Sequence, residues 1–106
     1  MSANTEVTKE VSRTEDLRYG RRTVGTSATT LAERITTDST GKTFRGVLIK
    51  CDANNTSPVY VGGVTVSAAD GFPIQPGEFL ELPVDDPSLI YVISDDSDQL
   101  IAWIGV

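Results

Sequence analysis

The stretch from residue 57 to residue 84 constrains the fold of this chain more than any other. Its sequence, SPVYVGGVTVSAADGFPIQPGEFLELPV, places short valine-rich runs between turn signals that recur every few residues. Branched side chains suit the pleated, half-buried surface of a sheet. The turn signals Gly62-Gly63, Asp70-Gly71 and Pro76-Gly77 supply the positive or preset φ values that a reversing chain needs. Together they predict a small antiparallel β domain.

The glycine pair changes the apolar pattern inside this stretch. Val59 and Val61 precede it at odd positions, whereas Val64 and Val66 follow it at even positions. A two-residue hairpin at the glycines would keep all four valines on one face. A bulge would do the same by adding one residue. The sequence favours neither alternative over the other.

Further short strands are expected on both sides of this stretch. Residues 23–31 are β-branched but polar, which predicts an edge strand, and a turn is expected at residues 38–41. The next run begins with Phe44, and alternation then places Val47, Ile49 and Cys51 on one face with Leu48 on the other. Further along, Leu80 and Leu82 are expected to point inward, while Glu78 and Glu81 lie in a polar turn or on the outer surface. Seven or eight strands at this spacing predict an all-β protein, a small antiparallel β-sandwich in either a simple or a jelly-roll form.

Two strands near the carboxyl end, over residues 89–93 and 100–104, are apolar on both faces. One sandwich core covers only one face of each strand. The second face must be covered by a loop of the same chain or by another subunit. We predict a subunit interface there, formed by Leu89, Tyr91, Ile93, Ile101 and Trp103.

Charge is distributed unevenly over a chain whose net charge is −6. Residues 1–50 hold all nine Lys and Arg with six acids, and residues 51–106 hold nine acids and no base. An acidic half argues against a nucleic-acid-binding groove, which would be basic. The charge either keeps the protein soluble, or it faces solvent while the basic end is attached to a negative partner. No apolar run approaches the roughly 20 residues of a membrane span, and residues 1–10 lack the apolar core of a signal peptide.

Residues that carry chemistry are scarce in this sequence. It contains no histidine and one cysteine, and Cys51 alternates with Val47 and Ile49, which is typical of a core position. Asp95, Asp96 and Asp98 offer three carboxylates, whereas calcium takes about six to eight oxygens. A solvated hairpin turn is therefore favoured there. We predict no catalytic residues, no metal site, no cofactor and no enzymatic activity.

The first 22 residues lack strand alternation and form a predicted N-terminal arm, so that the β-sandwich domain covers residues 23–106. The arm is either a solvated terminus or a segment that orders along a partner. The second alternative predicts a binding set of spaced apolar residues and clustered arginines: Val7, Val11, Arg13, Leu17, Arg18, Tyr19, Arg21 and Arg22.

Residues 23–106 resemble small virion structural proteins of tailed bacteriophages. The run VYVGG followed by GFPIQPGEFLEL carries the resemblance, with RGVLIKCDANNTSPVYVGG upstream and DDPSLIYVISDDSDQLIAWIGV downstream. The resemblance implies a β-sandwich module of the head decoration (cement) or head-fibre type. It further implies the virion, at the capsid surface, as its location after synthesis in the bacterial cytoplasm. The expected partner is the major capsid protein, in a homotrimer, with no nucleic acid and no membrane.

A second function remains open beside capsid decoration. The chain would then be a receptor- or carbohydrate-binding module of a phage fibre, spike or tail component. Such a module needs exposed aromatic side chains on one face, and the candidates are Tyr60, Phe72, Phe79, Tyr91 and Trp103.

Overall fold

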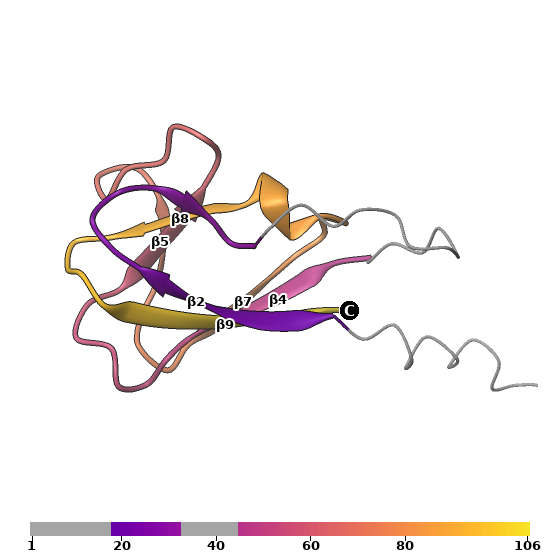
Figure 1. The fold of residues 1–106 in the computed structure, drawn as a ribbon, viewed down its shortest axis with the longest axis horizontal. Helices are drawn as coiled ribbons and strands as arrows, with labels where there is room; N and C mark the ends of the chain where they lie inside the picture. Colours follow the sequence, from indigo (N-terminus) through magenta and orange to yellow (C-terminus); the bar gives the residue numbers. More distant parts are fainter. Residues whose placement is uncertain (1–17, 33–44) are drawn as a thin grey trace, which may run out of the picture.

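A computed structural model of the chain describes residues 18–32 and 45–106. These residues form eight strands in two four-stranded sheets, and every pairing between neighbouring strands is antiparallel. The sheets pack against each other as two layers, with a single 3-10 turn beside them (Figure 1). The predicted all-β antiparallel sandwich is confirmed.

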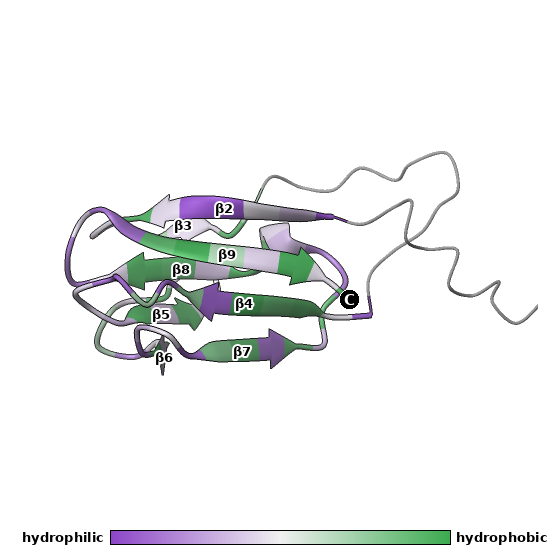
Figure 2. Cartoon of the chain, turned by 90° about the horizontal axis from the view of Figure 1, so that it is seen from below, coloured by the Kyte–Doolittle hydropathy of each residue, from purple (hydrophilic) through white to green (hydrophobic). Residues whose placement is uncertain are grey.

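The first layer is named here the β9 sheet, after its longest strand. Its order is β2-β9-β4-β7. The strands are β2 (Tyr19–Val24), β9 (Gln99–Gly105), β4 (Val47–Cys51) and β7 (Phe79–Leu82). Figure 2 shows hydrophobic segments on β9 and β4 beside the more hydrophilic β2.

The second layer is named the β8 sheet. Its order is β3-β8-β5-β6. The strands are β3 (Thr29–Thr30), β8 (Tyr91–Ser94), β5 (Val59–Gly62) and β6 (Phe72–Ile74). The 3-10 turn η2 (Pro87–Leu89) enters β8, and Asp86 caps it by accepting a hydrogen bond from the Ser88 amide.

The core lies between the two sheets and follows the alternation of the sequence. In β9, Gln99, Ile101, Trp103 and Gly105 are buried while the residues between them are half-buried. Full burial of one large apolar side chain contributes about 1.5–3 kcal/mol. The predicted inward face of β4 is confirmed at Val47, Ile49 and Cys51; Phe44 lies outside the described residues. The apolar core residues are Val24, Leu31, Val47, Ile49, Cys51, Val59, Val61, Ile74, Ile90, Val92, Ile101 and Trp103.

The predicted turn at Pro76-Gly77 is confirmed and sets the register of β7. The Glu78 amide donates to the Gln75 carbonyl, and Gly77 has a φ of +89°. Proline at the second position and a positive φ at the third make this a type II turn. Cys51 then faces both Gly77 and Glu78, since its carbonyl accepts from one and its amide donates to the other. This bulge puts Leu80 and Leu82 against the core and leaves Glu78 and Glu81 exposed, as predicted.

Neither alternative for the glycine pair is correct. Strand β5 ends at Gly62, and the chain continues as a loop before it returns as β6. Val64 is exposed, whereas Val66 is buried outside the main core. The four valines therefore do not share one face, because the loop is longer than either local device would allow.

Two strand boundaries also differ from prediction. Residues 23–31 do not form one edge strand: β2 ends at Val24, and β3 begins at Thr29 in the other sheet. Both are edge strands, and the segment between them crosses from one layer to the other. The expected turn at residues 38–41 lies outside the described residues.

The domain begins earlier than the predicted boundary at residue 23. Tyr19 to Arg22 pair with β9 as part of β2, so they belong to the sandwich. Gly20 permits this pairing beside a large core side chain, because a Cβ atom there would lie 2.9 Å from Nε1 of Trp103. The predicted arm thus reduces to residues 1–17, which lie outside the described residues.

Candidate interaction surface

The outer face of the β9 sheet carries apolar side chains across its central strands. Registers place Tyr19, Ile104 and Leu48 in one row across β2, β9 and β4. The next row holds Arg21, Ala102 and Lys50. Alternation along each strand points all six away from the core. One row is therefore aliphatic and aromatic. The row beside it has the small Ala102 between the two cations Arg21 and Lys50.

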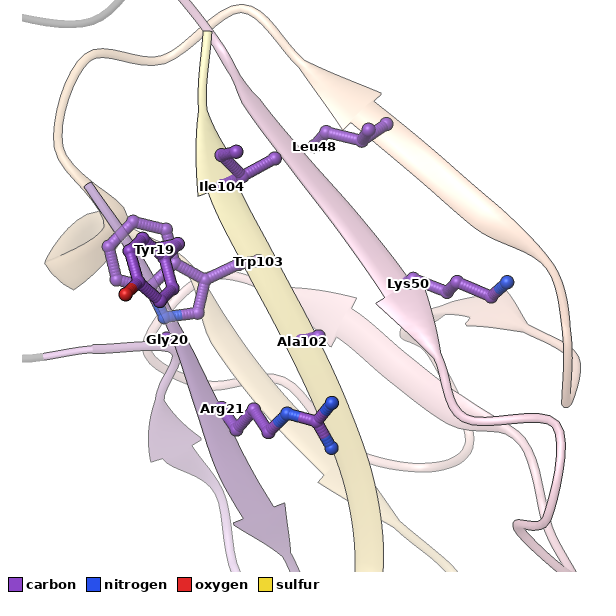
Figure 3. A pocket seen from close by; sticks show the side chains of 8 residues that line it. All are labelled: Tyr19, Gly20, Arg21, Leu48, Lys50, Ala102, Trp103 and Ile104. Carbon is purple, nitrogen blue, oxygen red and sulfur yellow. The ribbon is translucent and has the colours of Figure 1, made fainter. Parts of the chain in front are cut away.

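A shallow hollow of about 470 Å³ lies on this face around the small side chain of Ala102 (Figure 3). Tyr19, which is 71% exposed, stands at one side and Lys50 at the other. The residues that line the hollow are Tyr19, Gly20, Arg21, Leu48, Lys50, Ala102, Trp103 and Ile104. It is an open depression in a sheet surface and suits a protruding group of another macromolecule.

Arg21 and Lys50 give this hollow its charge. Among the described residues, neither has a hydrogen-bond or ion-pair partner, although five bases and nine acids fall in those parts of the chain. Arg22 differs, since its Nε donates to the Leu31 carbonyl at 3.2 Å and thereby links the two sheets at the β2–β3 side. The two cations beside Ala102 are thus available to an external anion.

The outer face of the β8 sheet is partly covered by its own chain. The loop 63–71 folds back over β5, so that Val66 lies against Gly62 and Gly71 lies against Tyr60. A Cβ atom at Gly62 would lie 2.7 Å from Cγ2 of Val66, and one at Gly71 would lie 2.6 Å from the Cβ of Tyr60. Glycine is therefore required at both positions for the loop to come this close.

A carboxylate holds the covering loop in shape. Oδ1 of Asp70 accepts hydrogen bonds from the Ser67 amide (2.8 Å) and the Ser67 hydroxyl (3.0 Å). The hydrogen bond from the Ser67 backbone, with that from its hydroxyl, lowers the pKa of Asp70 below its ordinary value. The predicted Asp70-Gly71 turn is confirmed, since both amides donate to the Ser67 carbonyl.

One end of the sandwich is acidic and is named here the acidic end. At this end the β8–β9 turn lies near the residue after β4 and the residue before β7. The acidic residues there are Asp52, Glu78, Asp95, Asp96 and Asp98. The solvated turn predicted at 95–98 is present and all four of its residues are exposed, but it is not a hairpin, because it connects β8 in one sheet to β9 in the other. Oδ2 of Asp95 accepts from the Tyr60 hydroxyl at 3.2 Å, and Asp96 accepts from the Ser57 hydroxyl. Partial burial, with this neighbouring carboxylate, raises the pKa of Tyr60.

Side-chain hydrogen bonds tie the acidic end to β9, and the sequence analysis did not identify them. Asn55 acts as a strand partner for Leu100: its Nδ2 donates to the Leu100 carbonyl and its Oδ1 accepts from the Leu100 amide, both at 2.8 Å. Oε1 of buried Gln99 accepts from the amides of Thr56 and Ser57. An amide side chain in a polar run such as DANNTSP can donate and accept at once, and this was the available signal for the Asn55 bonds.

An apolar groove runs along the β6–β7 side of the sandwich, opposite the side that Arg22 closes. It has a volume of about 440 Å³. Leu89 and Phe72, 61% and 59% exposed, stand at its rim. The residues that line it are Val61, Gly62, Gly63, Phe72, Leu80, Leu82, Val84, Leu89 and Ile90. Both flanking strands are sheet edges, so their outward backbone groups have no strand partner among the described residues.

The predicted subunit interface is wrong in part. Ile101 is fully buried and Trp103 is 8% exposed, so both belong to the core of one chain. The outward side chains of β9 are Leu100, Ala102 and Ile104 instead. Tyr91 and Ile93 do point outward, but from the β8 sheet, and Leu89 lies at the groove. The two strips cannot form one patch because β8 and β9 belong to opposite layers.

The predicted arm residues divide between described and undescribed parts. Tyr19 and Arg21 lie on the outer face of the β9 sheet, and Arg22 is used inside the domain. The Arg18 carbonyl accepts from the Gly105 amide, next to the carboxyl terminus. Val7, Val11, Arg13 and Leu17 lie outside the described residues.

Cys51 is a core residue, as predicted. Burial, its largest influence, raises the pKa of the thiol, although Nδ2 of Asn55 donates to Sγ at 3.1 Å. Within residues 18–32 and 45–106 there is no cluster of three metal-ligating side chains. In the same ranges no helix has the length and apolar character to cross a bilayer. Comparison with protein-family models, with curated proteins and with solved structures finds no match in any of the three.

Proposed function

We propose that this chain is a non-enzymatic structural protein of a phage virion, most specifically a capsid decoration or cement protein. It would bind the assembled lattice of the major capsid protein and stabilise that lattice. A ligand that binds only the assembled state shifts the equilibrium toward it. Two observations support the proposal: the resemblance of residues 23–106 to such proteins, and the apolar outer face of the β9 sheet.

We infer that the strand arrangement is a jelly roll. A jelly roll forms when one long antiparallel hairpin of eight strands folds over into two sheets. Such a hairpin pairs the first strand with the eighth, the second with the seventh, the third with the sixth and the fourth with the fifth. The pairs β2–β9, β3–β8, β4–β7 and β5–β6 have this order. The remaining pairs, β4–β9 and β5–β8, are those that folding the hairpin creates.

The fold alone does not argue for a virion, because lectins and cupins also use jelly rolls. The observation that carries the proposal is the apolar outer face of the β9 sheet, with Arg21 and Lys50 beside Ala102. Monomeric proteins rarely leave a large apolar patch in water, and such patches mark contacts with other macromolecules. A face of this kind fits a protein whose function is to bind other proteins.

The proposed assembly is a homotrimer that is made in the host cytoplasm. It attaches to the outer capsid surface with the help of residues 1–17. Tyr19, Arg21 and Arg22 belong to the sandwich and not to the arm, with Tyr19 and Arg21 on the outer face of the β9 sheet and Arg22 bound to the Leu31 carbonyl. Residues 1–17 contain the remaining apolar residues Val7, Val11 and Leu17, with Arg13 and Lys9 as bases. They join the domain at Arg18, which is also the end of the sandwich where Val106 and Arg45 lie.

The test is quantitative mass spectrometry of purified particles of the phage that encodes the chain. The proposal expects a copy number comparable with that of the major capsid protein. Particles that lack the protein should bind the purified chain, and a variant without residues 1–17 should stay folded and bind less. Absence of the chain from particles contradicts a virion role, and undiminished binding by the shortened variant contradicts the role of residues 1–17.

The alternative, a receptor- or carbohydrate-binding module of a fibre or tail component, keeps one specific support. Phe72 and Phe79 are exposed along the β6–β7 side, where Phe79 reaches 68%. Aromatic side chains that stand in water suit sugar rings. The other candidates offer less, since Trp103 is buried and both Tyr60 and Tyr91 are half-buried. A copy number far below that of the capsid protein, with loss of cell binding in Phe72→Ala and Phe79→Ala, would favour this alternative.

A further inference from the structure

We propose that the outer face of the β9 sheet receives the acidic end of a second copy of this chain, so that copies associate into a closed ring. The contact joins Arg21 and Lys50 of one copy to Asp95 and Asp98 of the next. The inference concerns self-association only. It therefore stands or fails with the purified protein, whether or not that protein decorates a capsid.

The receiving surface combines two cations with an apolar floor. Arg21 and Lys50 flank Ala102 in one row, and the row beside it is Tyr19, Ile104 and Leu48. Neither cation has a partner among the described residues. A charge on an apolar surface is less screened by water than one on a polar surface, so it attracts an opposite charge more strongly. The face thus fits a carboxylate-bearing protrusion.

The inserted surface is the β8–β9 turn at the acidic end. Asp96 already accepts from Ser57 and Asp52 from the Asn54 amide, so these two carboxylates are engaged inside the chain. Asp98 has no hydrogen-bond partner among the described residues, and Asp95 holds only the exposed, long bond from Tyr60. These two carboxylates lie at the tip of a turn between the sheets, and no described base belongs to that turn.

Charge also decides the symmetry of the contact. A twofold contact would place two β9 faces against each other, with Arg21 and Lys50 of both copies in one interface. Glu81 of β7, which pairs with Leu48, is the only acid that the described strands add to this face. Like charges brought together in an interface cost several kcal/mol. Contact between two different surfaces avoids this cost and is heterologous.

The two surfaces of the contact face in different directions. The acidic end points along the strands, whereas the receiving face looks perpendicular to them, as the strand directions in Figures 1 and 2 show. Each contact therefore rotates the next copy relative to the previous one. A heterologous contact forms a ring when its repeated rotation closes and a helical filament when it does not. The proposed assembly is the closed ring, with three copies in agreement with the homotrimer proposed above.

The experiment is sedimentation velocity on the full chain and on two charge variants. Arg21→Glu with Lys50→Glu reverses the charge of the receiving face, and Asp95→Asn with Asp98→Asn neutralises the inserted turn. Asparagine suits position 98 because φ there is +62°. Each variant is expected to weaken association by roughly 100-fold and to sediment as a single chain of 11.4 kDa. High salt should weaken the wild-type assembly in the same direction.

Mixing the two variants identifies the heterologous contact. Each has one intact half of the interface, so a mixture should form a complex of two chains and nothing larger. Arg45→Glu and Asp85→Lys are matched charge reversals at exposed positions outside the contact, and they should keep the wild-type mass. Circular dichroism checks that every variant is folded. A monomeric wild-type protein, variants with wild-type mass, or a mixture that stays monomeric would each overturn the proposal.

Discussion

The two outer faces of the sandwich differ in how their apolar side chains are covered. Both sheets have strands that are apolar on two sides, and one core covers only the inner side of each. Over the β8 sheet, the loop 63–71 folds back and places Val66 on Gly62. Over the β9 sheet, no described segment does so, and a hollow remains around Ala102. One face is covered by a loop, whereas the other is left open by the described part of the chain.

The difference shows how a short chain divides its apolar residues between stability and association. The covering loop packs closely on the sheet only because Gly62 and Gly71 have no side chains, so its position depends on those two residues. The open face has no such requirement and instead carries two cations without partners in the described parts of the chain. We therefore expect changes to the first face to affect unfolding, and changes to the second to affect assembly.

The largest expected effect is a difference in stability loss between an inward and an outward side chain of β9. Ile101→Ala empties a fully buried position and should cost about 2–5 kcal/mol of unfolding free energy. Ile104→Ala makes the same chemical change on the outer face, where the side chain is half-buried, and should cost under about 1 kcal/mol. Urea unfolding of dilute protein measures both. Equal losses would mean that the outer face is packed within one chain.

The next effect concerns the covering loop. Gly62→Ala puts a Cβ atom 2.7 Å from Cγ2 of Val66, and such overpacking costs about 1–3 kcal/mol. Gly63→Ala is the matched control, because a Cβ atom there meets nothing within 4 Å. Adding Val66→Ala removes the clashing methyl group and should recover part of the loss caused by Gly62→Ala. Equal stability of the two glycine variants would show that the loop does not contact the sheet in solution.

A smaller effect should appear when the pH falls. The pKa of Asp70 is lower in the folded chain than its ordinary value, so its carboxylate stabilises the covering loop at neutral pH. This contribution is present above the ordinary value, near pH 4, and is lost as the pH falls through the folded pKa. Asp70→Asn should remove that part of the pH dependence. The check is to measure the unfolding free energy of the wild type and of Asp70→Asn between pH 2 and pH 7. If that free energy has the same pH dependence in the two proteins, the prediction is wrong.

The smallest expected effect is the labelling of the Cys51 thiol in the native protein. Burial raises the pKa of its thiol, so little thiolate forms and a maleimide reagent should react very slowly with the native protein. The same reagent should react fully after unfolding. Fast labelling of the native chain would show that the acidic end opens, since Asn55 and the thiol lie together there.

The sequence predicted the fold class because the relevant signals are local. Alternation along β4 and the Pro76-Gly77 turn depend on neighbouring residues, and both are confirmed. The pairing of Tyr19–Val24 with β9 joins the two ends of the described chain, and no local pattern reports such a contact. The role of Gly20, to make room for Trp103, appears only when the two strands are paired.

The candidate surface was predicted less well for a related reason. A strand that is apolar on both faces does not reveal which face the core uses. Ile101 and Trp103 were assigned outward, whereas the parity of β9 in the sheet points Ala102 and Ile104 outward. The sequence also offered a covering loop and a subunit interface as alternatives. The described structure holds a loop on one face and none on the other, a distinction that requires the two layers to be known.

The most direct measurement of the central claim is thiol accessibility on the two faces as a function of protein concentration. Ala102→Cys puts a thiol in the hollow, and Thr30→Cys puts one beside Tyr91 on the outer face of the β8 sheet. Since Cys51 is buried, the introduced thiol dominates the labelling. We expect Ala102→Cys to be protected in concentrated protein and to become reactive on dilution, and Thr30→Cys to label at one rate throughout. Labelling of Ala102→Cys at the same rate at every concentration would contradict the claim that another copy occupies this face.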